Sequence, residues 1–496
     1  MSTVNNGPQI VRSGLVLNLD ASSANSYGPI KAEVLVVAGG GAGGGYHGGG
    51  GGAGGVLYTS NYTIVRNTTY TVTVGLGGAG ASSTSNTGDP GQNSIFSGAS
   101  TVLTAVGGGA GKSQGNATTA RNNGGSGGGG CDGNSSSITG GSGTAAQGFN
   151  GGDVSGASGD LLAVYYGTAG GGGAGGVGGT GGIVNGGFGG PGLPFSISGT
   201  TQYYGGGGGG TNLTNVLTYG IGGIGGGGTG GVSPSPHNSP LRYSTNGSAN
   251  TGGGGGGYLY SGNGGGSGGS GIVIIRYKGP QKATGGTVTT VGSETVHTFT
   301  SSGTFVTGTN FIDLSGNGNT GSLVNGVGYS GSNGGSLSFD GINQRVSTNY
   351  KPSGERSYFI WVKFSSLTHS SGYSLTGTQE ANSYTYIGIE NGGGIYYYAG
   401  ASTGGSIGNP VTVNTWVNIG FALFPDGSRR VYKNGIEIHY NTGGLGGTAT
   451  LEFSVGCINQ NHFITGNISN VTIYNRALSA SEIMQNFQAT KTRFGL

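Results

Sequence analysis

Charged residues are scarce in this sequence: Asp, Glu, Lys and Arg together make up 7% of its 496 residues. The net charge of +3 is small, and the basic residues are scattered along the chain. A protein that binds nucleic acid through backbone phosphates needs clustered basic residues, so the composition predicts no nucleic-acid partner. Disorder driven by high net charge is disfavoured as well, so some ordered structure must hold the chain together.

Cysteines and long apolar runs are also few. Two cysteines, Cys131 and Cys457, cannot form a disulfide framework. We interpret them as buried or incidental thiols, with one long-range bridge as the alternative. No apolar run approaches the ~20 residues that span a bilayer, which predicts no membrane insertion. The first five residues lack a basic region followed by an apolar one, so we expect no Sec signal.

Glycine is present in large excess, and 87 of the 125 glycines lie within residues 31–280. This stretch opens with an apolar strand at 33–38 and closes with another at 272–277. The glycines lack the strict three-residue period of collagen. Because β-branched strands hold the tracts at both ends, we predict an ordered bundle of extended polyglycine II-type chains, joined by backbone hydrogen bonds. Mobile glycine loops are the alternative.

The rest of the sequence has the pattern of an all-β domain. Residues 14–21 predict a strand with Leu15, Leu17 and Leu19 on one face. Asn434-Gly435 lies between two apolar runs and predicts a type I′ hairpin turn. Ser479 and Glu482 form a capping box that predicts a helix over 479–488. The strands expected after residue 310 are 336–339, 358–364, 384–389, 395–398, 416–423, 430–433, 436–439, 453–455 and 470–474.

The C-terminal part resembles the concanavalin A-like, laminin G-type sandwich domains. The pieces that carry the resemblance are Asp313 to Asn319, Gly335 to Gly341, Trp416-Val417, Val431 to Gly435, and the closing 466–468 and 477–479. In such domains a strand like 14–21 lies only a short loop before the 313–319 piece. Here residues 22–309 separate the two. The resemblance therefore implies a concanavalin A-like jelly-roll sandwich with a large glycine-rich domain inserted in an early loop, and an insertion with neighbouring ends.

The insert itself is similar to the glycine-rich domains of bacteriophage tail-fibre and adhesin proteins. Residues 34–41, 70–75 and 270–277 carry this similarity. The piece 297–305 also occurs near such domains, usually ahead of them. The expected domains are 1–30 (N-terminal arm and first sandwich strand), 31–280 (glycine-rich inserted domain), 281–309 (β connector) and 310–496 (laminin G-like sandwich).

Motifs for catalysis are weak. Glycosidases of this sandwich class use two carboxylates about 5–9 Å apart, whereas the acidic residues of the C-terminal part are isolated in sequence. We interpret them as solvated surface residues: Glu355, Glu380, Glu390, Asp426, Glu437 and Glu452. Gly111-Lys112-Ser113 lacks the upstream glycine of a phosphate-binding loop. No Ser/His/acid set and no His/Cys metal set can be assembled from spacing, so the sequence predicts no enzyme.

Oxygen-bearing side chains in turn-rich loops are candidate ligands for one cofactor, calcium. The candidates are Asp313, Asn317, Asn319 and Asp340, and the resembled domains often bind calcium near such loops. The competing interpretation is that these side chains satisfy the backbone of the turns.

Aromatic residues supply the candidate binding positions. Trp361 and Trp416 lie in alternating strands and are expected in the core. The run 396–398 places at least one tyrosine ring on an outer face, where a sugar could stack. Other aromatics interrupt the glycine tracts, either as loop-tip contacts or as plugs that seal the bundle. The receptor-contact candidates are Tyr46, His47, Tyr165, Tyr166, Tyr203, Tyr204, Tyr258, Tyr260, Tyr396 and Tyr398.

Together the two resemblances imply a non-enzymatic virion structural protein of a bacteriophage, made in the host cytoplasm. We expect a tail-fibre or adhesin subunit that recognises a host cell-surface glycan. Other virion proteins and further copies in a homotrimer are the other expected partners. A capsid-decorating or head-fibre protein is one alternative, and a glycan-degrading tail enzyme is another. Dense acidic residues in one cleft would favour the enzyme.

Overall fold

The chain forms two compact units in the computed structural model, Met1–Ile30 together with Thr309–Leu496, and Lys31–Gly308. We call them the sandwich unit and the glycine-rich unit and describe each by itself. The structure describes residues 8–23, 26–81, 87–99, 101–114, 119–132, 139–155, 167–182, 185–212, 219–231, 243–259, 264–308, 310–368, 372–380, 383–399, 404–442, 451–458 and 462–496.

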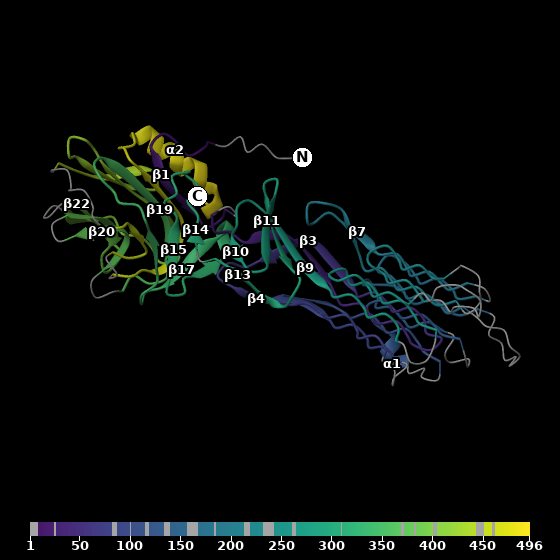
Figure 1. Ribbon diagram of the computed structural model, residues 1–496. Helices are drawn as coiled ribbons and strands as arrows, with labels where there is room; N and C mark the ends of the chain where they lie inside the picture. Colours follow the sequence, from purple (N-terminus) through teal and green to yellow (C-terminus); the bar gives the residue numbers. More distant parts are fainter. Residues whose placement is uncertain are drawn as a thin grey trace, which may run out of the picture. The chain divides into compact units, whose positions relative to one another are not determined.

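The sandwich unit is built from two eight-stranded antiparallel sheets (Figure 1). The first sheet contains β1 (Leu15–Asp20), β16 (Gly328–Ser330), β17 (Ser336–Asp340), β19 (Arg356–Phe364), β24 (Trp416–Leu423), β25 (Arg429–Lys433), β26 (Ile436–Asn441) and β28 (Thr465–Tyr474). The second contains β14 (Asn310–Phe311), β15 (Gly321–Val324), β18 (Arg345–Thr348), β20 (Tyr373–Glu380), β21 (Ser383–Ile389), β22 (Ile395–Ala399), β23 (Gly404–Gly408) and β27 (Ser454–Val455). Buried side chains from both sheets form one core, which confirms the all-β sandwich.

The two parts of the sandwich unit that flank the glycine-rich stretch meet in space. Strand β1 pairs with β28, with Leu19 opposite Val471. The backbone N–H of Ile312 donates to the carbonyl oxygen of Ser26 at 3.2 Å. The ring of Tyr27 packs edge-on against Phe311, with the two centroids 5.7 Å apart. The chain thus leaves and re-enters this unit at one place, as is usual for an inserted domain.

The structure confirms the hairpin turn and the helix that local sequence signals predict in the sandwich unit. Asn434 and Gly435 have φ values of 52° and 78°, as the type I′ turn between β25 and β26 requires. Helix α2 (Ala480–Thr490) begins at the Ser479 cap with its capping box to Glu482. It is followed by a 3-10 helix, η2 (Lys491–Phe494), and a second one, η1 (Ser332–Gly334), precedes β17.

Both tryptophans are buried, as predicted, but they pack outside the main core. Trp361 and Trp416 form a cluster with Phe494, and Phe487 of α2 packs against it. The Trp361 ring stacks on Phe494 with centroids 4.0 Å apart. The helical C-terminal segment therefore covers the face of the first sheet that points away from the second.

Glu482 gives the helix a testable pH dependence. Side-chain hydrogen bonds from Arg476, aided by bonds from Ser479 and opposed by partial burial, lower the pKa of the Glu482 carboxyl from 4.5 to about 2. Because the folded-state pKa lies below the unfolded value, the carboxylate stabilises the fold above about pH 4.5 and loses this effect as the pH falls through about 2. We expect Glu482→Gln to lower the melting temperature of the full chain at pH 7 and to match the wild type near pH 2. Melting curves of both proteins from pH 7 to pH 2 test this, and a constant difference would contradict it.

The glycine-rich unit contains three antiparallel sheets. Its strands are β2 (Ile30–Val37), β3 (Val56–Ile64), β4 (Thr69–Thr73), β5 (Ser94–Gly98), β6 (Thr101–Ala105), β7 (Leu193–Phe195), β8 (Gln202–Tyr204), β9 (Ile272–Lys278), β10 (Ala283–Thr284), β11 (Thr287–Val291), β12 (Glu294–Phe299) and β13 (Gly303–Thr307), with one short helix, α1 (Thr119–Asn122).

The segment 281–309, which we predicted as a separate connector, belongs to this unit up to Gly308. Strand β12 pairs along the whole of β9, and β13 pairs with β4. The prediction was wrong because β9 and β4 leave open edges whose N–H and C=O groups these strands satisfy, which a linear sequence does not show.

The glycine tracts run as extended chains away from these sheets (Figure 1), and their hydrogen bonds repeat every three residues. The N–H groups of Gly50, Gly51 and Gly52 donate to the carbonyls of Ala169, Gly255 and Gly109, on three different tracts, at 2.8–2.9 Å. The next three donors return to the same tracts: residues 53, 54 and 55 bond to 172, 252 and 106. A left-handed helix with three residues per turn aims successive N–H groups a third of a turn apart. The pattern therefore agrees with the predicted polyglycine II-type bundle.

Absence of side chains is what permits this packing. A Cβ atom at Gly208 would lie 2.0 Å from the carbonyl oxygen of Gly255, and one at Gly51 would lie 2.2 Å from that of Gly41. These blocking atoms are backbone, so they cannot move aside as a side chain would. The glycine tracts thus hold together through backbone hydrogen bonds, whereas the strands of the unit also bury an apolar cluster that includes Leu35, Val37 and Ile274.

Two further expectations concern buried thiols and membranes. Cys131 and Cys457 are both buried thiols, as the first of our two interpretations has it. Among the residues that the structure describes, no helix is long and apolar enough to cross a membrane.

Candidate functional site

A pocket of about 290 Å³ opens on the second sheet of the sandwich unit, on strands β21 to β23. Alternation along β22 creates it: Tyr397 points into the core, whereas Tyr396 and Tyr398 line the pocket on the opposite face. Tyr386 of β21 stands directly opposite Tyr398 in the antiparallel register. One face of two adjacent strands thereby collects three tyrosine rings.

Two glycines make room for these rings. Gly388 is the cross-strand partner of Tyr396, and Gly404 is the partner of Tyr398. A Cβ atom at position 388 would lie 2.6 Å from Cζ of Tyr396, and one at position 404 would lie 2.6 Å from Cδ1 of Tyr398. Each ring therefore lies over the bare backbone of its neighbour strand, an arrangement that also shields glycines in a sheet.

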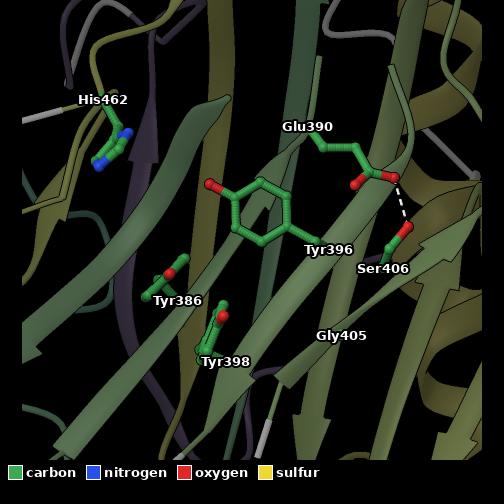
Figure 2. Close-up of a pocket in the computed structure, with 7 residues that line it drawn as sticks. All are labelled: Tyr386, Glu390, Tyr396, Tyr398, Gly405, Ser406 and His462. Carbon is green, nitrogen blue, oxygen red and sulfur yellow. Dashed lines mark hydrogen bonds between the residues drawn. The ribbon is translucent and has the colours of Figure 1, made fainter. Parts of the chain in front are cut away.

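The three rings form a corner. Tyr386 and Tyr398 stack with centroids 5.0 Å apart and planes 24° apart. Tyr396 lies nearly perpendicular to both, at 84° to Tyr386 and 81° to Tyr398. Figure 2 shows the face of Tyr396 as the floor and the other two rings edge-on beside it. A flat ring face with upright neighbours is a surface on which a sugar ring can stack.

Polar groups border this aromatic corner. Glu390, Ser406 and His462 line the remaining sides, and the Ser406 hydroxyl donates to a carboxylate oxygen of Glu390 (Figure 2). The Tyr396 hydroxyl donates to the carbonyl of Tyr373 at 3.2 Å, which anchors the floor. Burial is the main cause that raises the pKa of Tyr396, and the negative charge of Glu390 adds to it. The floor is thus a neutral ring beside a carboxylate.

Sequence reasoning found Tyr396 and Tyr398 but missed the other lining residues. It treated Glu390 as an isolated surface carboxylate, and it gave no role to Tyr386, Ser406 or His462. The alternation of Tyr384 and Tyr386 in a predicted strand was an available signal for one more ring. His462 could not be found in this way, since it lies 64 residues beyond Tyr398 and reaches the pocket only through the fold.

The other aromatic candidates belong to the glycine-rich stretch of the chain. Tyr204 and Tyr258 are 5% and 3% exposed. Of the two interpretations of these aromatics, this burial favours the plug that seals the bundle over the loop-tip contact. Tyr203, next to Tyr204 on β8, is 39% exposed. Tyr165, Tyr166 and Tyr260 lie outside the described residues.

Tyr46 and His47 form a strained turn in the glycine-rich unit. Their φ values are 42° and 51°, in a left-handed region that bulky residues rarely adopt. His47 Nδ1 lies 2.7 Å from Asp132 Oδ2. This contact holds the turn in place, which accounts for a structural role at these two positions.

The predicted calcium ligands are occupied with other partners. Asp313 accepts four hydrogen bonds, from the N–H of Asn18, Ser315 and Asn319 and from the Ser315 hydroxyl, at 2.7–3.0 Å. The side-chain amides of Asn317 and Asn319 donate to the carbonyls of Leu15 and Val16. Asp340 lies in another turn, where it accepts from Ile342 N–H.

A cation would have to displace these donors, so the loop does not fit calcium and instead fits the turn-satisfying interpretation. In the described part of the chain, no group of three or more His, Cys, Asp or Glu residues could hold a metal ion. The 313–319 loop, which follows the insert in the chain, is hydrogen-bonded to β1, which precedes it.

Comparison with solved structures gives likenesses that each cover part of the chain. Domain 4 of AbnA, a GH43 extracellular arabinanase from Geobacillus stearothermophilus in complex with arabinotriose, is 21% identical over 35% of this chain and 91% of its own, with a TM-score of 0.31. The receptor-binding domain of botulinum neurotoxin type G is 16% identical over 36% and 48%, with a TM-score of 0.31. A mutant Trypanosoma rangeli sialidase with trans-sialidase activity is 14% identical over 38% and 32%, with a TM-score of 0.32. The chain thus spans less than half of the latter two.

Comparison of the sequence with protein families gives two matches. A model of the concanavalin A-like lectin/glucanases superfamily matches residues 331–484, within the sandwich unit. A model of a glycine-rich domain matches residues 21–278, more than half of the chain. No curated protein matches the sequence. The protein therefore belongs to the glycine-rich domain family, and it carries a concanavalin A-like domain of the lectin/glucanase superfamily in the same chain.

Proposed function

We propose that this protein binds glycans through the tyrosine pocket of its sandwich unit and does not cleave them. The observation that carries the proposal is the corner of Tyr386, Tyr396 and Tyr398, with Glu390, Ser406 and His462 at its edge. Aromatic faces pack against the C–H face of a sugar, and the surrounding hydroxyl, carboxylate and imidazole groups suit its hydroxyls.

Binding without cleavage is favoured by the acidic groups of the pocket. Glycoside hydrolysis uses a pair of carboxyl groups, ~5–9.5 Å apart. Among the described lining residues Glu390 is the one carboxylate, and its oxygen is held by Ser406. The pocket therefore offers positioning and stacking without the second carboxylate that the reaction needs.

The glycine-rich unit extends the proposal to a biological role. Its resemblance to tail-fibre and adhesin domains supports a bacteriophage adhesin subunit, located on the virion, whose target is a host cell-surface glycan. A backbone-bonded bundle can hold its shape while the loops between tracts vary, since loops tolerate change better than the elements they connect. Other virion proteins and further copies in a homotrimer are the partners that this role entails.

The pocket can be tested by removing its floor. We expect Tyr396→Ala to weaken glycan binding by about tenfold or more, because the stacking face is lost. Tyr440→Ala is the matched control, since Tyr440 is an exposed tyrosine of the first sheet, 50% accessible and outside the pocket. Binding of the full chain to a glycan array and to whole host cells measures the effect, with the melting temperature as a check on folding.

Three outcomes are informative. Loss in Tyr396→Ala with retention in Tyr440→Ala supports the pocket. Equal binding by both variants and the wild type would place recognition elsewhere. Release of sugar from host polysaccharide by the wild type, abolished in Glu390→Gln, would overturn the non-enzymatic proposal.

A further inference from the structure

The polar edge of the pocket points to a particular class of glycan. We propose that the pocket selects sugars that carry a protonated amine, with the ammonium group seated between the face of Tyr396 and the carboxylate of Glu390. This inference rests on the proposed glycan-binding function and narrows its ligand. It adds a charge requirement to a site whose rings alone would accept many neutral sugars.

The tyrosine rings supply the first part of the argument. The face of an aromatic ring carries negative charge density, and it attracts cations within about 6 Å of the ring centre. Tyr386 and Tyr398 stack against each other at 5.0 Å, so no ligand fits between them. Both rings stand nearly perpendicular to Tyr396, and Figure 2 shows them beside the edge of its ring and not over the face that is drawn. The ring face that Figure 2 shows broadside, next to the edges of the other two rings, is the floor, and we place the ligand there.

Glu390 supplies the second part. One of its carboxylate oxygens accepts a hydrogen bond from Ser406, and Figure 2 shows the other oxygen on the side that faces the Tyr396 ring. Ser406 therefore orients the carboxylate and leaves an acceptor directed at the floor. A carboxylate that accepts from an ammonium makes a charge-assisted hydrogen bond, stronger than its bond to a neutral hydroxyl. The face of Tyr396 and the carboxylate of Glu390 thus both favour a positive charge between them.

The remaining lining residues are consistent with a cationic ligand of modest size. No Lys or Arg occurs among the described residues that line the pocket, so no fixed positive charge competes with the ligand. The volume of about 290 Å³ is near the lower end of the ~300–1,000 Å³ typical of small-ligand pockets. It suits one or two sugar rings, of which one bears the amine.

Matched sugars that differ only at the amine test the proposal. The probes are glucosamine and galactosamine, as monomers and β-linked dimers, each with a free amine and with an N-acetylated amine. We expect the full-length protein to bind at least one free-amine member about tenfold more tightly than its N-acetylated partner at pH 7. Short probes are used so that a polycationic chain cannot bind through many weak contacts. Isothermal titration calorimetry measures the affinities.

Two charge-neutralising variants locate the effect. Glu390→Gln keeps the shape of the side chain and is expected to reduce the preference for the free amine to within about twofold. Glu437→Gln is the control: Glu437 lies on β26 of the other sheet, in a salt bridge with Arg430, and the variant is expected to retain the preference. Loss of preference in Glu390→Gln alone would assign the charge recognition to the pocket.

Results that contradict the amine preference can be told apart from results that contradict glycan binding itself. If the protein binds N-acetylated or other neutral sugars at least as tightly as the free amines, the charge inference is wrong while glycan binding stands. A preference that survives in Glu390→Gln also overturns it. If neither these probes nor any member of a glycan array binds, the proposed function fails together with the inference.

Discussion

Gly208→Ala is expected to disrupt the glycine-rich unit, although it adds only one methyl group. The new Cβ would lie 2.0 Å from the carbonyl oxygen of Gly255, 2.6 Å from its carbonyl carbon and 3.1 Å from the nitrogen of Gly51. Extra methylene groups in a packed core cost about 1–3 kcal/mol when side chains can shift. Here only backbone surrounds the site, so relief requires tracts to separate and to lose hydrogen bonds such as Gly208 N–H to Gly51 at 2.8 Å. We therefore expect a cost at or above the upper end of that range.

Gly182→Ala is the matched control for this substitution. No heavy atom lies within 4 Å of a Cβ atom at Gly182, and its φ lies outside the left-handed region. Hydrogen exchange of the tract amides in the full chain measures the bundle, and fluorescence of Trp361 and Trp416 measures the sandwich unit. Faster exchange in Gly208→Ala, with unchanged fluorescence and a normal Gly182→Ala protein, is the expected result. Wild-type exchange rates in Gly208→Ala would contradict the bundle.

Asp313→Ala is expected to destabilise the sandwich unit by about 3 kcal/mol. The substitution removes the acceptor of four hydrogen bonds. It leaves without this partner the buried N–H of Asn18 and the partly buried N–H groups of Ser315 and Asn319, and an unsatisfied donor costs about 1–3 kcal/mol where water cannot reach it. One of these donors is the N–H of Asn18 on β1, 295 positions earlier in the chain. Loss of this hydrogen bond therefore weakens the contact between β1, which precedes the insert, and the 313–319 loop, which follows it.

Asp340→Ala is the control, because the Asp340 carboxylate accepts a turn hydrogen bond from Ile342 N–H and lies at an exposed position. We expect a cost below about 1 kcal/mol. Urea unfolding followed by tryptophan fluorescence compares the two variants with the wild type. Calcium and EDTA are expected to leave all three midpoints unchanged. A rise of the wild-type midpoint with calcium that is absent in Asp313→Ala would restore the calcium hypothesis.

Features that depend on nearby residues could be predicted from the sequence. The capping box of Ser479 and Glu482 predicted where α2 begins, because it requires only a spacing of three residues. The Asn434-Gly435 turn predicted its hairpin in the same way. Two apolar strands flanking long glycine tracts predicted extended chains, since glycine without a side chain permits close approach and the strands hold the ends.

Features that depend on pairing between residues far apart in the chain could not be predicted from the sequence. Strands β10 to β13 have no sequence mark that assigns them to the open edges of β9 and β4. The pocket requires the register of β21 against β22, which brings Tyr386 opposite Tyr398 and Gly388 opposite Tyr396. Glu390 was interpreted as solvated because it is isolated from other acidic residues in the sequence. Its neighbours in space come from β22 and β23, and they give it a different role.

The threefold repeat of the bundle sets a unit of length for changes in this sequence. Three residues added within a tract lengthen it by about 9 Å and return every later N–H to the neighbour it faced before. One or two added residues turn all later N–H groups toward a different neighbour and break the whole run. Loops between tracts are not bound by this count. We expect length differences among relatives to take any value in the loops and multiples of three within the tracts, much as coding sequences tolerate insertions that keep their frame.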